Sequence, residues 1–228
     1  MEGRIRKLGL VLALFGLAFI VGGGYAFIKV QDGQRSLDAF SAAQGVELSY
    51  NEDGQLVDRG TTEGAQAIMS LLTNDWSFPV QPEELNPNDP VVNTGSEYMY
   101  QMATVTYHTL HGTQKVVLPE DVTAADGTVY QAGTYEFPID GRYFAHFDRS
   151  NPIEAKAREQ AWTGTAHALI AQLGVGTATA SSLQMGLGLA GLFGGVGFTF
   201  ILAGLGLVWA TRLETTKVPV LRPAAMPA

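Results

Sequence analysis

Two long runs of apolar residues, each without a charged side chain, constrain what this chain can fold into. The first run lies between Lys7 and Lys29, and the second lies between Glu159 and Arg212. An α-helix rises about 1.5 Å per residue, so about 20 apolar residues cross the roughly 30 Å hydrocarbon core of a bilayer. The sequence therefore predicts two transmembrane helices, which cover residues 8–28 and 183–210.

Basic residues flank both predicted spans on the side of the chain termini. They are Arg4, Arg6 and Lys7 before the first span, and Arg212, Lys217 and Arg222 after the second. Short flanks rich in Lys and Arg stay in the cytoplasm. We therefore expect residues 1–7 and 211–228 to be cytoplasmic, and residues 29–180 to form an extracytoplasmic domain. The apolar run of the first span is long for a signal peptide, so we interpret it as a retained anchor.

The predicted outer domain is strongly acidic. Between Val30 and Ala180, 20 Asp or Glu residues stand against 7 Lys or Arg residues, a net charge of about −13. This charge argues against nucleic acid as a partner. The chain has no cysteine, which excludes disulfides and a thiolate nucleophile. Exported domains without cysteine are more usual in bacteria than in animal secretion, so the absence of cysteine favours a bacterial source.

Turn and cap signals divide the N-terminal half of the outer domain. The Asn-Glu-Asp-Gly sequence at residues 51–54 predicts a turn between two short strands. Thr61 or Thr62 caps a predicted helix that ends at residues 74–75. Four prolines then place residues 78–92 in an extended loop.

The sequence of residues 94–111 has features of both a strand and a helix. Their Thr-Val-Thr-Tyr sequence has strand character, whereas Thr94 and Glu97 have the spacing of a capping box at a helix start. Gly112 is also a suitable residue just beyond a helix C-terminus. We favour the helix and keep the strand as the alternative.

Strand and turn signals dominate the next part of the outer domain. The segments 115–118, 129–130, 135–137 and 143–147 have strand character, and a turn at Gly133 separates the two middle segments. Asp126-Gly127 and Asp140-Gly141 are typical turn dipeptides between strands. These features predict a small antiparallel sheet.

A strong helix start follows the predicted sheet. Asn151 is a good N-cap, Pro152 favours the first helical position, and Glu154 suits the first turn. We predict an amphipathic helix over about residues 152–173, with a break before the second span at residues 174–176 (Gly-Val-Gly). The chain is thus expected to be an α+β membrane protein, in which two transmembrane helices flank a mixed domain with helices and a small antiparallel sheet.

Small residues recur at four-residue spacing in both spans, which is the pattern that lets helices pack closely in lipid. The second span carries two such rows, and the first span carries a short one. The predicted packing residues are Gly186, Ala190 and Gly194 in one row, Gly191, Gly195, Thr199 and Ala203 in the second, and Ala18 and Gly22 in the first span. Because one partner helix covers a single face, the spare row predicts packing into a larger assembly of integral membrane subunits.

The sequence shows no catalytic motif. His108, His111 and His146 are weak candidates for metal ligands, but they lack the spacing of known motifs, and we predict no metal, cofactor or catalytic residue. Six tyrosines of the outer domain fill a core or line a binding groove, and we favour the core. They are Tyr98, Tyr100, Tyr107, Tyr130, Tyr135 and Tyr143.

Two segments resemble a known group of proteins. They are residues 107–110 (Tyr-His-Thr-Leu) and residues 143–152 (Tyr-Phe-Ala-His-Phe-Asp-Arg-Ser-Asn-Pro). With the two-span plan, they resemble actinobacterial membrane proteins that are often labelled aromatic ring-opening dioxygenase-like. Residues 115–140 depart from that pattern as an insertion. The resemblance implies an actinobacterial plasma membrane and no reaction, because a ring-opening dioxygenase needs iron held by His and carboxylate ligands.

Three functions remain open at this point. We favour a non-catalytic accessory or structural subunit of a larger plasma-membrane complex, and a respiratory oxidoreductase assembly is our best single hypothesis. Its partners would be other membrane subunits, bound through the second span and the outer domain, and the lipid bilayer. The alternatives are a stand-alone exported binding or sensor domain anchored by two helices, and a metalloenzyme that uses the histidines named above.

Overall fold

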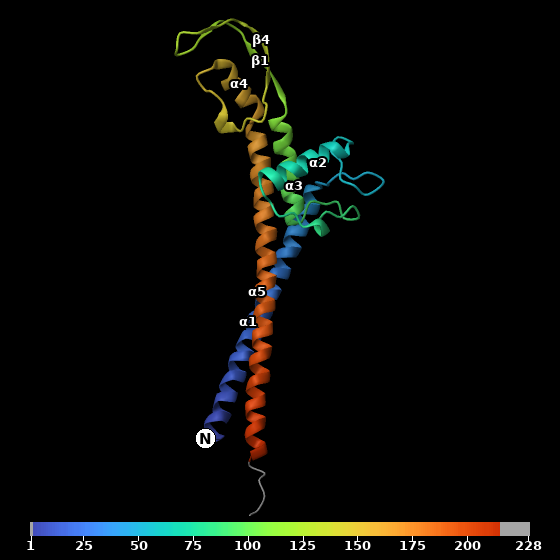
Figure 1. Ribbon diagram of the computed structural model, residues 1–228, viewed down its shortest axis with the longest axis vertical. Coiled ribbons are helices and arrows are strands. Elements are labelled where there is room, and N and C mark those ends of the chain that lie inside the picture. Colours follow the sequence, from blue (N-terminus) through green and yellow to red (C-terminus); the bar gives the residue numbers. More distant parts are fainter. Residues whose placement is uncertain (1, 215–228) are drawn as a thin grey trace, which may run out of the picture. The chain divides into compact units, whose positions relative to one another are not determined.

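Figure 1 shows the computed structural model of the chain, which describes residues 2–214. The chain forms two compact units. Unit 1 combines the chain up to Gln34 with the chain from Ser182 onward, and unit 2 is formed by Arg35–Ser181. Most of the predicted cytoplasmic tail, from residue 215 on, lies outside the described residues.

Two long apolar helices supply unit 1. Helix α1 spans Glu2–Gln44 and helix α5 spans Gly164–Glu214, and only their parts up to Gln34 and from Ser182 belong to this unit. Both helices are long and apolar enough to cross a membrane. Both helices also extend well beyond the predicted spans and continue past the ends of their apolar runs.

Helices α2 and α3 form one half of unit 2. Helix α2 (Thr62–Ser70) begins at the N-cap Thr61, and its last turn, Leu71–Asp75, has π-helical geometry. Helix α3 covers Gly95–Leu110. The predicted helix from Thr61 is confirmed, and so is the choice of helix over strand for residues 94–111.

The capping box at the start of α3 is complete and buried. One Glu97 carboxylate oxygen accepts hydrogen bonds from the backbone N–H groups of Asn93 and Thr94, at 3.0 and 2.9 Å, and from the Thr94 hydroxyl at 2.8 Å. Glu97 is only 2% exposed. Burial raises the pKa of the Glu97 carboxyl above its ordinary value, although the hydrogen bonds act in the opposite direction.

Two short antiparallel ladders and helix α4 form the other half of unit 2. Strand β1 (Thr113–Leu118) pairs with β4 (Gly133–Pro138), and β2 (Val122–Thr123) pairs with β3 (Val129–Tyr130). Val116 and Leu118 of β1 are buried, while their neighbours in the strand face outward. The antiparallel pairing confirms the predicted antiparallel strands, but they form two separate two-stranded sheets in place of one.

The predicted strand over residues 143–147 is wrong. Phe144–His146 form a short 3-10 turn, closed by a 2.8 Å hydrogen bond from the His146 N–H to the Tyr143 carbonyl. The apolar residues here serve packing instead of a ladder, because Tyr143 stacks on Trp162 and Phe147 is buried.

The predicted amphipathic helix over residues 152–173 is also wrong in its extent. Helix α4 spans Pro152–Ala161, with Asn151 as the expected N-cap. Trp162 then leaves the helical conformation, and its indole N–H donates to the Arg142 carbonyl at 3.1 Å. Thr163 caps the next helix by accepting the Ala166 N–H, so α5 begins at Gly164.

The predicted break at residues 174–176 does not occur, and α5 continues through it. Gly176 has another role. A Cβ atom built on Gly176 would lie 2.5 Å from the Tyr98 ring, far inside contact distance. The glycine therefore permits α5 to approach α3 closely, which a larger residue would prevent.

Smaller details of unit 2 complete the comparison. The turn at residues 51–54 is present, with Gly54 at a φ of +74°, but the flanking strands reduce to a single bridge between Tyr50 and Leu56. The proline-rich loop contains a short 3-10 turn at Pro82–Glu84. Hydrogen bonds from local polar residues satisfy the backbone groups of these turns. The short apolar stretches beside the turns therefore do not require a longer strand ladder.

Gly176 and Gly174 give a matched pair for testing the contact between α3 and α5. We expect Gly176→Ala to lower the free energy of unfolding by about 1–3 kcal/mol, because the new methyl overlaps the Tyr98 ring. Gly174→Ala should be neutral or stabilising by up to about 1 kcal/mol, since only Met102 sulfur lies nearby, at 3.9 Å, and alanine favours helix. Denaturant unfolding of the full chain in micelles measures both, and equal effects would contradict this packing.

The raised pKa of Glu97 predicts a pH dependence of stability. The folded chain holds the Glu97 proton more tightly than the unfolded chain, so stability falls as pH rises from the ordinary carboxyl pKa, about 4.5, through the folded pKa. Glu97→Gln should remove this part of the pH dependence, whereas Glu52→Gln, in an exposed turn, should retain it. Thermal unfolding at a series of pH values is the measurement, and identical pH slopes in both variants would refute the assignment.

Candidate functional site

In unit 1, helices α1 and α5 run antiparallel (Figure 1). They meet at small residues spaced seven apart. We call this contact the seam. Its buried members are Gly9, Gly16 and Gly23 on α1, and Ala190, Gly197 and Gly204 on α5. They pair in reverse chain order, so that Gly9 lies opposite Gly204 and Gly23 lies opposite Ala190.

The seam leaves no space for side chains at its centre. A Cβ atom built on Gly16 would lie 2.6 Å from the Gly197 carbonyl oxygen, and one built on Gly197 would lie 2.6 Å from the Gly16 carbonyl oxygen. Such a backbone approach maximises van der Waals contact, which is a main source of helix association in lipid. Phe19 packs beside it, with its ring centroid 5.7 Å from that of Phe193.

The seven-residue spacing has a geometric cause. An α-helix turns once in 3.6 residues, so every seventh residue returns almost to the same face, and a slight left-handed supercoil keeps it there. A four-residue row drifts around the helix more quickly. The recurrence of glycine at 9, 16, 23 and at 197, 204 was visible in the sequence and is the signal that identifies the seam.

Some of the packing residues predicted from the sequence lie in or beside the seam, and others lie outside it. Ala190 lies in the seam, Gly194 lies at its edge near Gly23, and a Cβ atom on Gly186 would meet Val30 at 2.7 Å. On the first span, Ala18 and Gly22 are exposed and lie outside the seam. Helix α1 thus presents Gly9, Gly16 and Gly23 to α5 in place of the predicted pair.

The second predicted row of α5 faces away from α1. Gly191, Gly195, Thr199 and Ala203 are all exposed. Cβ atoms built on Gly191 and Gly195 would meet no described atom within 4 Å, and the same holds for Gly188 and Gly206. We use the name outer row for the six exposed residues of this face, which are Gly188, Gly191, Gly195, Thr199, Ala203 and Gly206. The seam therefore uses one side of α5, and the outer row remains uncovered within the described part of the chain.

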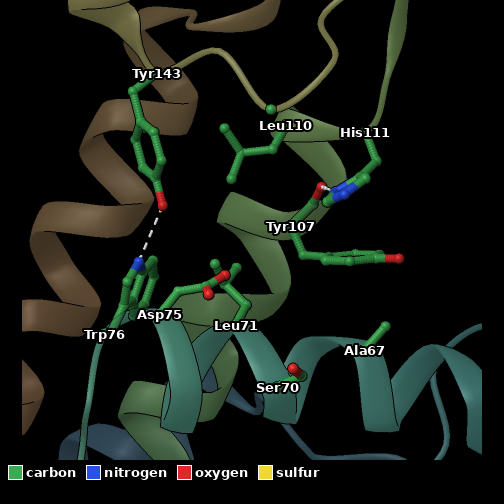
Figure 2. Close-up of a pocket in the computed structure, with 10 residues that line it drawn as sticks. Ala67, Ser70, Leu71, Asp75, Trp76, Tyr107, Leu110, His111 and Tyr143 are labelled. Carbon is green, nitrogen blue, oxygen red and sulfur yellow. Dashed lines mark hydrogen bonds between the residues drawn. The ribbon is translucent and has the colours of Figure 1, made fainter.

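Unit 2 contains a cleft of about 550 Å³ between α2, α3 and the loop after β4 (Figure 2). We call it the aromatic cleft. Its lining residues are Ala67, Ser70, Leu71, Asp75, Trp76, Tyr107, Leu110, His111, Gly141 and Tyr143. This volume falls within the range of small-molecule sites, roughly 300–1,000 Å³.

Hydrogen bonds and stacking hold the rings of the aromatic cleft in place. The Trp76 indole N–H donates to the Tyr143 hydroxyl at 3.0 Å, and Tyr143 stacks on Trp162 behind it. On the opposite side, His111 stacks on Tyr107 with ring centroids 4.1 Å apart, and His111 Nδ1 lies 2.9 Å from the Tyr107 carbonyl oxygen. Figure 2 shows the two ring pairs on either side of Leu110 and Leu71.

The three histidines considered as metal ligands have separate partners. His108 Nε2 lies 2.9 Å from an Asp58 carboxylate oxygen, His111 belongs to the aromatic cleft, and His146 packs its ring against Tyr143. Among residues 2–214, no three His, Asp or Glu side chains gather as a metal site would require. The structure therefore does not bring these histidines together.

The six tyrosines divide between core and cleft. Tyr98 and Tyr100 are 5% and 3% exposed, and Tyr98 shares a 2.7 Å hydrogen bond with Ser41. Burial raises the pKa of the Tyr100 hydroxyl, and the Asp58 carboxylate adds to the effect. Tyr107 and Tyr143 instead line the cleft, and Tyr130 and Tyr135 are half-buried in the β-ladders. The core interpretation therefore holds for Tyr98 and Tyr100, while Tyr107 and Tyr143 line a cleft whose role as a binding groove stays a prediction.

Comparison with known proteins identified no relative of this chain. No protein-family model, no curated protein and no solved structure matches the chain. The resemblance to actinobacterial two-span proteins therefore stays a hypothesis from the sequence.

Two glycine substitutions distinguish the seam from the four-residue row in the first span. We expect Gly16→Leu to separate α1 from α5, because its side chain would overlap the backbone at Gly197. Gly22→Leu should leave the pair intact, since nothing lies within 4 Å of a Cβ atom there. Dyes on Gly3→Cys and Ala210→Cys, at one end of the pair, report the separation by energy transfer in micelles. Equal loss of transfer in both variants would disprove the seam.

Proposed function

We propose that this protein is an accessory subunit of a larger plasma-membrane complex, anchored by two transmembrane helices and without a reaction of its own. Unit 1 would lie in the bilayer with both termini in the cytoplasm, and unit 2 would lie outside. The outer row of α5 is the observation that supports the proposal best.

The outer row is unusual for a surface that meets only lipid. Glycine weakens a helix interior by about 1 kcal/mol relative to alanine, and it offers no side chain for contact with acyl chains. Gly188, Gly191, Gly195 and Gly206 nevertheless share the uncovered side of α5. Small residues at such spacing have their use where another helix packs against them.

The seam explains why the outer row is free for a partner. Helix α1 occupies the side of α5 marked by Ala190, Gly197 and Gly204, so the pairing within the chain does not depend on the outer row. A second helix on that row would come from another subunit. The choice of a respiratory oxidoreductase assembly rests only on the sequence and its resemblance to actinobacterial proteins.

A second candidate function is ligand binding by unit 2, as a stand-alone exported binding domain. The aromatic cleft favours it, because two supported ring pairs line a volume suited to a small molecule. The two functions are compatible, since the outer row and the aromatic cleft belong to different units. The metalloenzyme alternative has no comparable support in the described residues.

Blue-native electrophoresis of membranes from the native host tests the accessory role. After mild solubilisation, the tagged wild-type chain should migrate within a complex larger than its own homodimer. Gly195→Leu should release the chain from that complex, because the side chain would occupy the contact surface of the outer row. Gly24→Leu adds the same side chain to α1, at a position with nothing within 4 Å, and should have no effect.

Migration of the wild-type chain only as a monomer or homodimer would contradict the proposal. Release of the chain by Gly24→Leu to the same extent as by Gly195→Leu would also contradict it. In that case general hydrophobicity of the spans, and not the outer row, would control the association.

A further inference from the structure

We propose that the aromatic cleft binds a small organic cation with a quaternary ammonium group. This inference rests on the second of the two functions above, ligand binding by unit 2, and is independent of the accessory role. Its basis is the combination of aromatic faces, a carboxylate and two helix C-termini around one cleft, in an acidic domain.

Aromatic rings form the walls of the cleft. Trp76, Tyr107 and Tyr143 all line it. The face of an aromatic ring carries negative electrostatic potential, so a ring face that lines a cleft attracts a quaternary ammonium group. In Figure 2, the Tyr107 ring lies between His111 and the α2 residues Ala67 and Ser70. One face of Tyr107 therefore stacks on His111, and the other is directed toward α2.

The rings that line the cleft are held in place before any ligand arrives. Trp76 and Tyr143 are joined by their 3.0 Å hydrogen bond, and Trp162 stacks behind Tyr143 at 5.8 Å between ring centroids. Tyr107 is supported by its stack with His111. Rings fixed in this way lose little conformational entropy on binding, which favours affinity for a small ligand.

One carboxylate and two helix ends bring negative charge to the cleft. Asp75 is its acidic lining residue, and no Lys or Arg lines it. Asp75 also ends the last turn of the α2 segment, and Tyr107, Leu110 and His111 belong to the C-terminal end of α3. A helix C-terminus carries about half a negative charge, so two of them and a carboxylate favour a cation.

The same features argue against an anionic ligand. A phosphate or carboxylate group is normally held by Arg, Lys or a helix N-terminus, and the lining of the cleft contains none of these. His111 directs Nδ1 toward the Tyr107 carbonyl oxygen, so in the neutral ring Nδ1 carries the proton and Nε2 is an acceptor. The acidic domain, with a net charge of about −13, would also attract cations to the cleft.

Calorimetric titration of choline into the full chain tests the proposal. The protein is kept in dodecyl maltoside, whose sugar head group contains no ammonium group to compete. The matched control ligand is 3,3-dimethyl-1-butanol, in which carbon replaces the charged nitrogen of choline. We expect choline to bind and the neutral analogue to bind at least about tenfold more weakly, because the aromatic faces and Asp75 distinguish the charge.

Two variants and one control locate the binding. Asp75→Asn and Tyr107→Leu should each weaken choline binding by about tenfold. Glu52→Gln removes one negative charge from an exposed turn outside the cleft and should leave the affinity unchanged within about twofold. Thermal unfolding of each variant without ligand checks that the fold is intact. If Tyr107→Leu fails to fold, Asp75→Asn carries the test, and Tyr107→Phe, which retains the ring, should bind choline as the wild type does.

Glycerophosphocholine distinguishes a free cation from a lipid head group. Because the cleft has no cationic side chain to meet the phosphate, choline should bind more tightly than glycerophosphocholine; the reverse order would assign the quaternary ammonium group to a lipid. Equal affinity for choline and its neutral analogue would overturn the charge selectivity but retain ligand binding by unit 2. No binding of any of the three compounds would overturn the inference, without bearing on the accessory role.

Discussion

The close backbone contact between α1 and α5 is the constraint on which unit 1 depends. Lipid offers two apolar helices no hydrophobic reason to associate, so association has to come from van der Waals contact and fit. The seam supplies this contact through glycine at every seventh position, and the carbonyl oxygens of Gly16 and Gly197 occupy the space that side chains would need. The seam also decides which surface of α5 remains free, because it uses one side of the helix and leaves the outer row uncovered.

A similar requirement for small residues operates in unit 2. Gly176 admits the Tyr98 ring against α5, where any side chain would overlap it. Elsewhere in this unit, polar contacts determine the structure: Glu97 completes the capping box of α3, and the hydrogen bond between Trp76 and Tyr143 fixes the rings on one side of the aromatic cleft. Close packing thus fixes how long helices meet, while buried hydrogen bonds fix the local turns and the rings that line the cleft. The two candidate sites arise from these two kinds of contact.

The predictions that succeeded rest on local chemistry. The caps at Thr61 and Asn151 and the turn at Asp126-Gly127 act within a few residues, so the sequence displays them directly. The failures concern residues whose role is tertiary. The glycines at 174 and 176 resembled a helix break, but Gly176 serves a contact with a ring 78 positions away in the chain. Residues 143–147 resembled a strand because their apolar residues pack around Trp162. The aromatic cleft could not be predicted, since it joins the C-terminal ends of two helices to a distant loop.

The central claim is that the two long helices of one chain associate through the seven-residue seam when they lie in a membrane. Solid-state NMR of the chain in lipid bilayers, with ¹³C in the Gly16 carbonyl group and ¹⁵N in the Gly197 amide, tests it most directly. The account predicts a clear dipolar coupling between these two sites, because a Cβ atom on Gly197 would lie 2.6 Å from the Gly16 oxygen. The same measurement between Gly22 and Gly195, both outside the seam, should show none. Absence of the Gly16–Gly197 coupling in bilayers would contradict the account.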